Sequence, residues 1–88
     1  MPSRTVEMVN KRGLHARASA KFVTLAAAQS AEVEVEKDGN KVCGTSIMGL
    51  MMLGAAMGDS ITIRAEGEGA EQAVAALAEL VESRFGEE

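Results

Sequence analysis

The sequence predicts a two-layer α+β domain in which one open-faced sheet is covered on a single side by helices. Two patterns lead to this prediction. Strand-like segments alternate apolar and polar residues, so each should bury one face and leave the other in water. Helix-like segments repeat apolar residues every three or four positions, and the whole order is βαββαβα. The 88 residues, 47% of them hydrophobic, suffice for one domain, 1–88, with a two-layer core.

Four short segments have the alternation typical of strands. The expected strands are 5–9, 32–36, 41–43 and 60–66. Their inward apolar residues are Val6 and Met8, Val33 and Val35, and Ile61, Ile63 and Ala65. Between the second and third strands, Asp38-Gly39 predicts a tight hairpin turn, from which the chain returns as a short strand.

Three further segments have helical spacing. The expected helices are 16–28, 47–53 and 70–85. The first is alanine-rich and repeats Ala16, Ser19, Ala20, Val23 and Ala27. The last repeats Ala73, Val74, Leu77, Leu80, Val81 and Phe85 along one stripe. Ser46 is suited to cap the middle helix, and the tail 86–88 is expected to fray.

Composition argues against several classes of function. No apolar run approaches the ~20 residues of a membrane span, and no signal-peptide segment follows Met1, so we expect no membrane partner. The single cysteine, Cys43, excludes an internal disulfide and fits a reducing, cytoplasmic location. With one cysteine and one histidine we expect no metal and no cofactor. The absence of Trp and Tyr supplies little for base stacking and argues against nucleic-acid binding.

The net charge of −4 hides an uneven distribution of charge. No acidic residue lies in 8–31 or in 39–58. The bases of these two segments are Lys11, Arg12, Arg17, Lys21 and Lys41. If the segments lie side by side in the fold, they form a basic-to-neutral face on an acidic body. Such a face suits an acidic protein partner or a small anion better than nucleic acid.

The stretch Gly13-Leu14-His15-Ala16-Arg17 carries the clearest chemistry. His15 is the only histidine and stands where a loop meets the first helix. The first N–H groups of that helix, those of Ala16 and Arg17, have no internal partner and form a ready anion site. Imidazole is largely neutral near pH 7, and its bond to phosphorus is labile, so His15 suits reversible acceptance of a phosphoryl group. Without this context, a lone histidine is more often a surface residue or a helix cap.

The neighbours of His15 support that interpretation. Gly13 should let the loop turn tightly, and Leu14 should anchor the loop by packing inward. Arg17 is a cation in the first turn of a helix, which opposes the helix dipole. A phosphoryl group or an acidic partner explains its presence, and the simpler interpretation is a solvated charge.

The segment 47–53 is apolar nearly all round, which is typical of a buried helix. A small two-layer domain has nothing to cover its far side, so we expect part of it to be exposed as a partner site. The expected interface residues are Ala20, Lys21, Ile47, Met48, Met51 and Met52. Methionine suits a surface that docks several proteins in turn. Alternatively, Met48 and Met52 fill the core.

The order of elements and two motifs, Gly13-Leu14-His15-Ala16-Arg17 and Ser46-Ile47-Met48-Gly49, resemble the HPr family. These are the histidine phosphocarriers of the bacterial phosphoenolpyruvate-dependent phosphotransferase system. The resemblance covers essentially the whole chain and implies an antiparallel sheet of strand order 1-4-2-3. Ala18 stands where the family usually has proline, and Thr45 replaces a common lysine.

The resemblance also implies a function. In this family, enzyme I phosphorylates a histidine at its pros nitrogen, Nδ1, and the phosphoryl group passes to an EIIA domain. His15 matches that histidine, and Arg17 matches the arginine of the active centre. Ser46 matches the regulatory serine that an ATP-dependent HPr kinase/phosphorylase modifies in some bacteria. The chain would then be a monomeric carrier, regenerated stoichiometrically, and not an enzyme.

Other functions remain open at this point. A small acylphosphatase-like enzyme could hold phosphate with an arginine loop, although no group that would position water is apparent. An adaptor without transfer activity is disfavoured by the presence of His15. Within the carrier interpretation, the sugar-uptake and the nitrogen-regulatory branches both remain possible.

Overall fold

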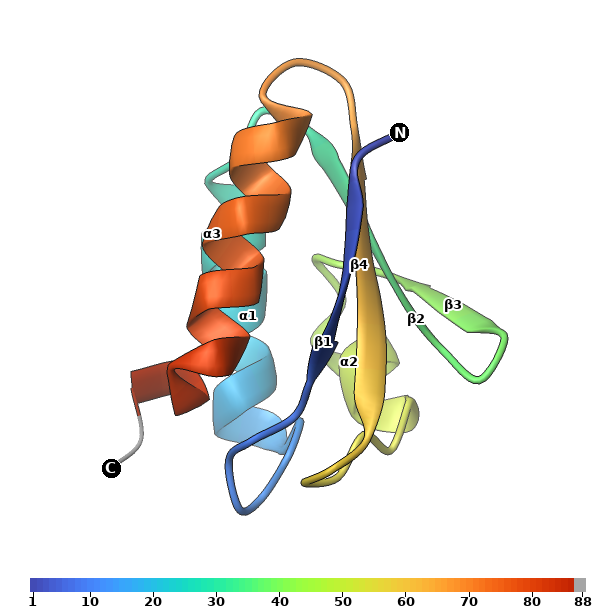
Figure 1. Cartoon of the computed structure of the whole chain (residues 1–88), viewed down its shortest axis with the longest axis vertical. Helices are drawn as coiled ribbons and strands as arrows, with labels where there is room; N and C mark the ends of the chain where they lie inside the picture. Colours follow the sequence, from blue (N-terminus) through green and yellow to red (C-terminus); the bar gives the residue numbers. More distant parts are fainter. Residues whose placement is uncertain (87–88) are drawn as a thin grey trace.

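Within residues 1–86, the part of the chain that the computed structural model describes, four strands form one antiparallel sheet (Figure 1). The strands are β1 Ser3–Glu7, β2 Glu32–Lys37, β3 Asn40–Cys43 and β4 Ser60–Glu66. They pair in the order β1–β4–β2–β3, which confirms the order implied by the resemblance. The predicted turn Asp38-Gly39 joins β2 to β3, with both residues at positive φ.

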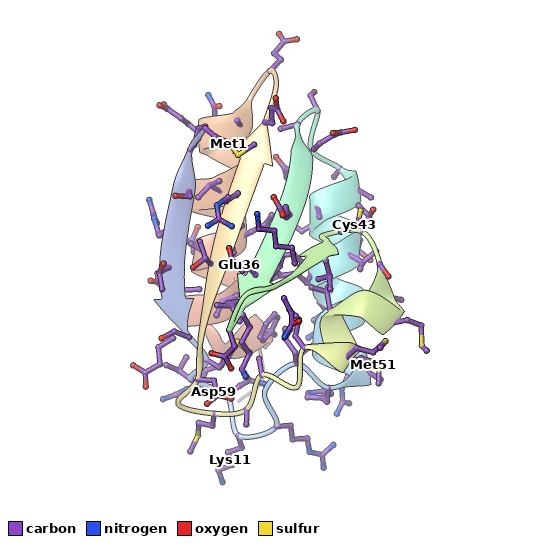
Figure 2. All side chains as sticks on the ribbon, turned by 90° about the vertical axis from the view of Figure 1, so that its right-hand side faces the viewer. Met1, Lys11, Glu36, Cys43, Met51 and Asp59 are labelled. Atoms are coloured by element: carbon purple, nitrogen blue, oxygen red, sulfur yellow. The ribbon has the colours of Figure 1, made fainter. Side chains whose placement is uncertain are left out.

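The alternation of the strands sorts their side chains between two faces. All seven residues predicted to point inward are buried. In residues 1–86 no helix covers the opposite face, which carries mostly polar side chains, as Figure 2 shows. On this face the hydroxyls of Thr5 and Thr62 lie 2.9 Å apart across β1 and β4, and Arg64 forms an ion pair with Glu36. The open-faced sandwich predicted from the sequence is confirmed.

The first strand is displaced from its predicted position. It spans 3–7 rather than 5–9, because its ladder with β4 begins at the pair Ser3–Arg64 and ends at Glu7–Ser60. Met8 lies beyond the strand but remains buried, and its N–H donates to the carbonyl of Asp59 at 2.7 Å. The prediction that Val6 and Met8 point inward is therefore confirmed, although the predicted bounds of the strand are wrong.

Three α-helices in the described residues pack around the inward face. They are α1 Ala16–Ala27, α2 Ile47–Met52 and α3 Ala70–Glu82. The long helix α3 lies along β1 and β4, α1 packs beside it, and α2 contacts α1 and β3 (Figure 1). The core between the layers includes the fully buried side chains of Phe22, Leu50 and Leu77. No helix in residues 1–86 is long and apolar enough to cross a bilayer.

Two details of the helices differ from the predictions. The buried residues of α1 are Ala18, Ser19, Phe22 and Ala26, so that of the repeated series Ala16, Ser19, Ala20, Val23 and Ala27 Ser19 alone is buried. The buried face is rotated because the bulky ring of Phe22 is the side chain that fills the core. α3 ends at Glu82 rather than Phe85, since Arg84 and Phe85 adopt positive φ in the 3-10 helix Arg84–Gly86. Of the tail expected to fray, Glu87 and Glu88 lie outside the described residues.

Candidate functional site

His15 is the N-cap residue of α1. Its backbone is extended, with φ −76° and ψ −177°, and its Nδ1 accepts a hydrogen bond from the backbone N–H of Arg17 at 3.2 Å. Because Nδ1 is the acceptor in this bond, it carries a lone pair and not a proton in this arrangement. The side chain is half-buried. A nucleophilic nitrogen therefore lies against the N–H groups of a helix N-terminus.

The loop before His15 makes a turn that requires glycine at position 13. Gly13 has φ +61°, and a Cβ there would lie 2.1 Å from the carbonyl oxygen of Ala55. Leu14 is buried and donates its N–H to the same carbonyl at 2.9 Å. The predicted tight turn and the inward packing of Leu14 are confirmed.

Two buried polar side chains fix this loop, and neither role was predicted from the sequence. Asn10, 2% exposed, donates from Nδ2 to the carbonyl of Gly13 at 2.9 Å. Ser19, 0% exposed, donates from Oγ to the carbonyl of Leu14 at 3.2 Å. Buried polar groups need partners, and these two bond the last two carbonyls before His15. The one available signal was the spacing of Asn10 and Gly13, which is typical of a turn.

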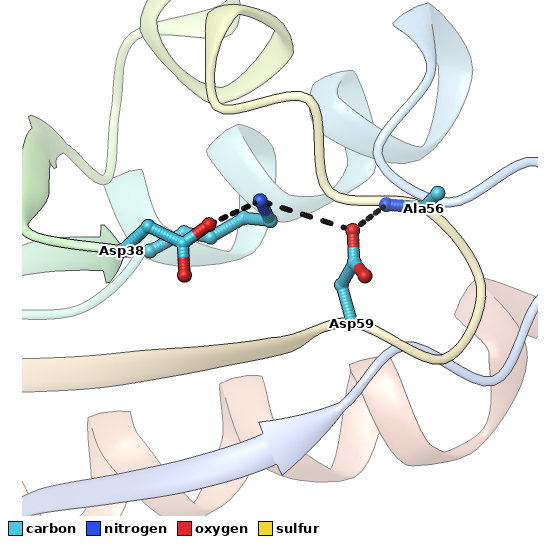
Figure 3. A network of polar contacts seen from close by, with 4 residues as sticks. Asp38, Ala56 and Asp59 are labelled. Atoms are coloured by element: carbon cyan, nitrogen blue, oxygen red, sulfur yellow. Dashed lines mark hydrogen bonds and ion pairs between the residues drawn. The ribbon is translucent and has the colours of Figure 1, made fainter.

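The segment 55–59 supports the loop from the other side. Asp59 Oδ2 accepts the N–H of Ala56 at 3.0 Å (Figure 3), and the Asp59 N–H donates to the Ala56 carbonyl at 2.9 Å. Lys37, at the end of β2, bonds Asp38 at 2.9 Å and lies 3.8 Å from Asp59 Oδ2. The hydrogen bond with Asp38 raises the pKa of Lys37 above its ordinary value. These contacts tie the β2–β3 hairpin to the segment that abuts Gly13, and no sequence motif marked them.

Arg17 lies in the first turn of α1, where no acidic residue accompanies it. Its exposed side chain lines a cavity of about 700 Å³. The other cations that line this cavity are Lys11, Arg12, Lys21 and Arg84. The cavity thus gathers all four bases of the acid-free segment 8–31 and adds Arg84 from the far end of the chain. We call it the cationic cavity.

The two acid-free segments lie side by side, which meets the condition stated for a basic-to-neutral face. The N–H of Leu14 bonds the Ala55 carbonyl at 2.9 Å, and the N–H of Gly58 bonds the Met8 carbonyl at 2.8 Å. α1 also packs against α2. A basic-to-neutral region is therefore continuous from the loop before His15 to α2.

Ser46 is the N-cap of α2, as predicted. Its Oγ accepts the N–H of Gly49 at 2.9 Å, and the residue is half-buried. Just before it, the Thr45 hydroxyl lies 3.1 Å from the exposed Cys43 Sγ, and hydrogen bonding from Thr45 lowers the pKa of that thiol. Ser46 therefore stands at the junction between edge strand β3 and α2.

One side of α2 presents apolar side chains to solvent. We call Ile47, Met48, Met51 and Met52 the methionine surface. Met48 and Met52 are 69% and 80% exposed, whereas Leu50 and Leu53 turn into the core. Met51 projects beside the sheet from the same helix (Figure 2). The predicted exposure is confirmed, and the alternative that Met48 and Met52 fill the core is wrong.

The remaining two interface candidates lie on α1. Ala20 is half-buried. Lys21 is exposed, and its Nζ donates to the carbonyl of Phe85 at 2.8 Å. The structure groups Lys21 with Arg17 at the cationic cavity.

Comparison with known proteins identifies the family. The profile described as "PTS HPr component phosphorylation site" matches residues 2–83. The chain belongs to the HPr family. The phosphocarrier protein HPr of Neisseria meningitidis serogroup B is 46% identical over 87 residues, which cover 99% of this chain and 98% of that protein. The phosphocarrier protein NPr of Shewanella violacea is 39% identical over 84 residues, covering 96% and 92%.

A solved HPr structure also matches the whole chain. HPr-C-His from Thermoanaerobacter tengcongensis superposes with a TM-score of 0.95 at 49% identity, covering 100% of this chain and 99% of that one. The open-faced α+β sandwich is therefore the HPr fold. The relatives named above are both phosphocarrier proteins of this family.

Proposed function

We propose that His15 accepts a phosphoryl group from phospho-enzyme I on Nδ1 and passes it to an EIIA-type domain. The observation that carries this proposal is the position of Nδ1 at the N-terminus of α1. Attack by the Nδ1 lone pair forms a phosphorus–nitrogen bond while the bond between phosphorus and enzyme I breaks. In the onward step the bond to Nδ1 breaks as a bond to EIIA forms. Water takes no part in either step.

Groups of the protein itself would hold the transferred phosphoryl group. The N–H groups of Ala16 and Arg17 are the first of α1, so they can donate to phosphoryl oxygens. The guanidinium of Arg17 adds donors in a planar fork that matches such oxygens. These donors are held by the helix before the phosphoryl group arrives, so little reorganisation accompanies transfer.

The methionine surface is proposed to dock both enzyme I and EIIA domains. A carrier must bind two unlike partners in turn with one face. Flexible methionine side chains can repack against different surfaces. The surface lies on α2, which packs against the helix that His15 caps.

Ser46 is proposed as a regulatory site for an ATP-dependent kinase. Its hydroxyl begins the helix that bears the methionine surface. A phosphate there adds roughly −2 charge next to Ile47 and Met48. The added charge should weaken docking of enzyme I, because it must be desolvated at the interface and repels acidic groups of the partner.

Phosphorylation of His15 variants tests the proposal. Wild-type protein is incubated with phosphoenolpyruvate and purified enzyme I, and intact mass is measured. We expect a gain of one acid-labile phosphoryl group in the wild type and none in His15→Ala or His15→Asn. Asparagine is a good N-cap, so His15→Asn separates loss of the imidazole from loss of the cap.

Two outcomes would contradict the proposal. One is acid-labile phosphorylation that persists in both variants. The other is release of free phosphate by the wild type with no phosphoprotein formed, which would favour a hydrolase.

A further inference from the structure

The cations of the cavity come from two parts of the chain that are distant in sequence, residues 11–21 and the C-terminal 3-10 helix. The loop before α1 supplies Lys11 and Arg12, the first two turns of α1 supply Arg17 and Lys21, and the C-terminal 3-10 helix supplies Arg84. Figure 1 shows these segments together at one end of the molecule. His15 is not among the lining residues, so the cavity adjoins the phosphoryl-acceptor nitrogen without containing it.

The wall that carries Arg84 is held in place by specific contacts. Arg84 and Phe85 have φ of 62° and 55°, a conformation that side-chain-bearing residues rarely adopt. Burial of the Phe85 ring and the 2.8 Å bond from Lys21 Nζ to the Phe85 carbonyl maintain it. This backbone conformation costs free energy, and these two contacts hold it in place. The 3-10 helix is therefore an ordered wall of the cavity.

The cationic cavity concentrates positive charge. Five cations line it, and within residues 1–86 no acidic side chain does. Like charges gathered in a concave site repel one another and raise the local positive potential. The chain as a whole carries −4, so this concentration runs against its overall charge. An anionic ligand would relieve the repulsion.

We propose that the cationic cavity binds a small organic polyanion that carries two or more phosphoryl groups. Its volume of about 700 Å³ falls in the range of small-molecule sites. Five cations contributed by separate segments suit two anionic groups better than one. Val9 and the exposed Met57 also line the cavity and offer apolar contact to an organic scaffold.

Such a ligand would occupy Arg17 and so slow phosphoryl transfer at His15, a consequence that rests on the proposed function. Binding itself does not depend on that function, because the ligand contacts residues outside the acceptor. The two can therefore be tested separately.

Calorimetric titration with inorganic tripolyphosphate and with adenosine diphosphate tests the proposal. At ~0.15 M salt, where exposed charges are screened, we expect saturable binding of one molecule of each to the wild type. Lys11→Gln and Arg84→Gln should each weaken binding about fivefold or more, because each removes a charge-assisted contact. Lys41→Gln on β3 changes the net charge equally but lies outside the cavity, and it should weaken binding less than about twofold. His15→Asn, which removes the imidazole but keeps a capping side chain, should bind as the wild type does.

Three results would overturn the proposal. The first is the absence of saturable binding of either probe. The second is equal weakening by Lys41→Gln and Lys11→Gln, which would mean diffuse attraction to the surface. The third is loss of binding in His15→Asn with normal binding in both cavity variants, which would place the anion at the acceptor nitrogen. Circular dichroism of each variant checks that the fold is intact.

Discussion

His15 uses one nitrogen for two tasks. Nδ1 caps α1 by accepting the Arg17 N–H, and in the proposed reaction the same lone pair attacks phosphorus. Since it cannot do both at once, phosphorylation must replace the cap. Phosphoryl oxygens at this position can accept the N–H groups of Ala16 and Arg17. The first turn of α1 would then remain capped in both states of the carrier.

Replacing Gly13 with alanine should destabilise the protein by roughly 2–4 kcal/mol. The residue has φ +61°, and the new Cβ would lie 2.1 Å from the Ala55 carbonyl oxygen and 2.8 Å from the Ala56 Cα. Gly39→Ala is the matched control, because φ is +83° there but no described atom lies within 4 Å of a Cβ. It should lose only about 1–2 kcal/mol. Chemical denaturation measures the free energy of unfolding of both variants. Equal losses would mean that the close approach of Gly13 to segment 55–59 does not affect stability.

The residues of the site differ in how far they could be predicted. His15, Arg17 and Gly13 each have a distinctive chemical type at a distinctive position, which made them visible in the sequence. Asn10 and Ser19 did not stand out, because polar residues in a turn or on a helix are ordinarily exposed. Only the packing of α1 and its loop against the rest of the molecule buries them.

Among the three α-helices of residues 1–86, α2 buries the fewest side chains. It has six residues, and Leu50 is the buried one. A helix this short is not stable alone in water, so the Ser46 cap and the contacts with α1 and β3 must hold it. The apolar side chains left outside are the methionine surface.

Replacing Met48 with aspartate should weaken enzyme I binding by about 1–4 kcal/mol with little loss of stability. The side chain is 69% exposed, so the charge should meet water in the free protein and an apolar partner in the complex. Ala75→Asp, on the exposed side of α3, adds the same charge away from the methionine surface. Calorimetric binding and thermal unfolding are compared for the two variants. A collapse of stability in Met48→Asp, or equal weakening of binding in both, would contradict a docking role.

At Ser46, charge should matter more than the cap. Aspartate and asparagine both cap helices well and differ by one charge, so Ser46→Asp and Ser46→Asn form a matched pair. We expect Ser46→Asp to slow His15 phosphorylation by enzyme I, and Ser46→Asn to act as the wild type does. Ser46→Ala should lose about 1 kcal/mol of stability and keep its rate of phosphorylation. Equal rates for the Asp and Asn variants would leave Ser46 with a capping role only.

Element boundaries were predicted less well than element types. The alternation in β4 and the stripe of α3 identify those elements directly, since one face of each is buried. The ends are decided by partners distant in sequence. Pairing with β4 places β1 two residues earlier in the chain than predicted. The end of α3 before its predicted bound coincides with the hydrogen bond from Lys21 to the Phe85 carbonyl.

In the whole molecule, the candidate chemistry gathers at one end. The loop before α1, the N-terminus of α1, α2 and the end of α3 lie at the same end of the sandwich (Figure 1). The acid-free segments 8–31 and 39–58 meet there through backbone hydrogen bonds. The chain is acidic overall, so its charge is polarised. Such a polarised field should orient an acidic partner towards His15 before contact is made.

The most direct measurement is an NMR spectrum of the His15 ring in ¹⁵N-labelled protein during transfer. Phosphoenolpyruvate and enzyme I are added first, and an EIIA domain follows. We predict that Nδ1, which accepts the Arg17 N–H in the free protein, becomes the phosphorylated nitrogen. Addition of EIIA should then restore the original ring signals. An unchanged ring, phosphorylation at Nε2, or a phosphohistidine that EIIA does not discharge would contradict a carrier that works through Nδ1.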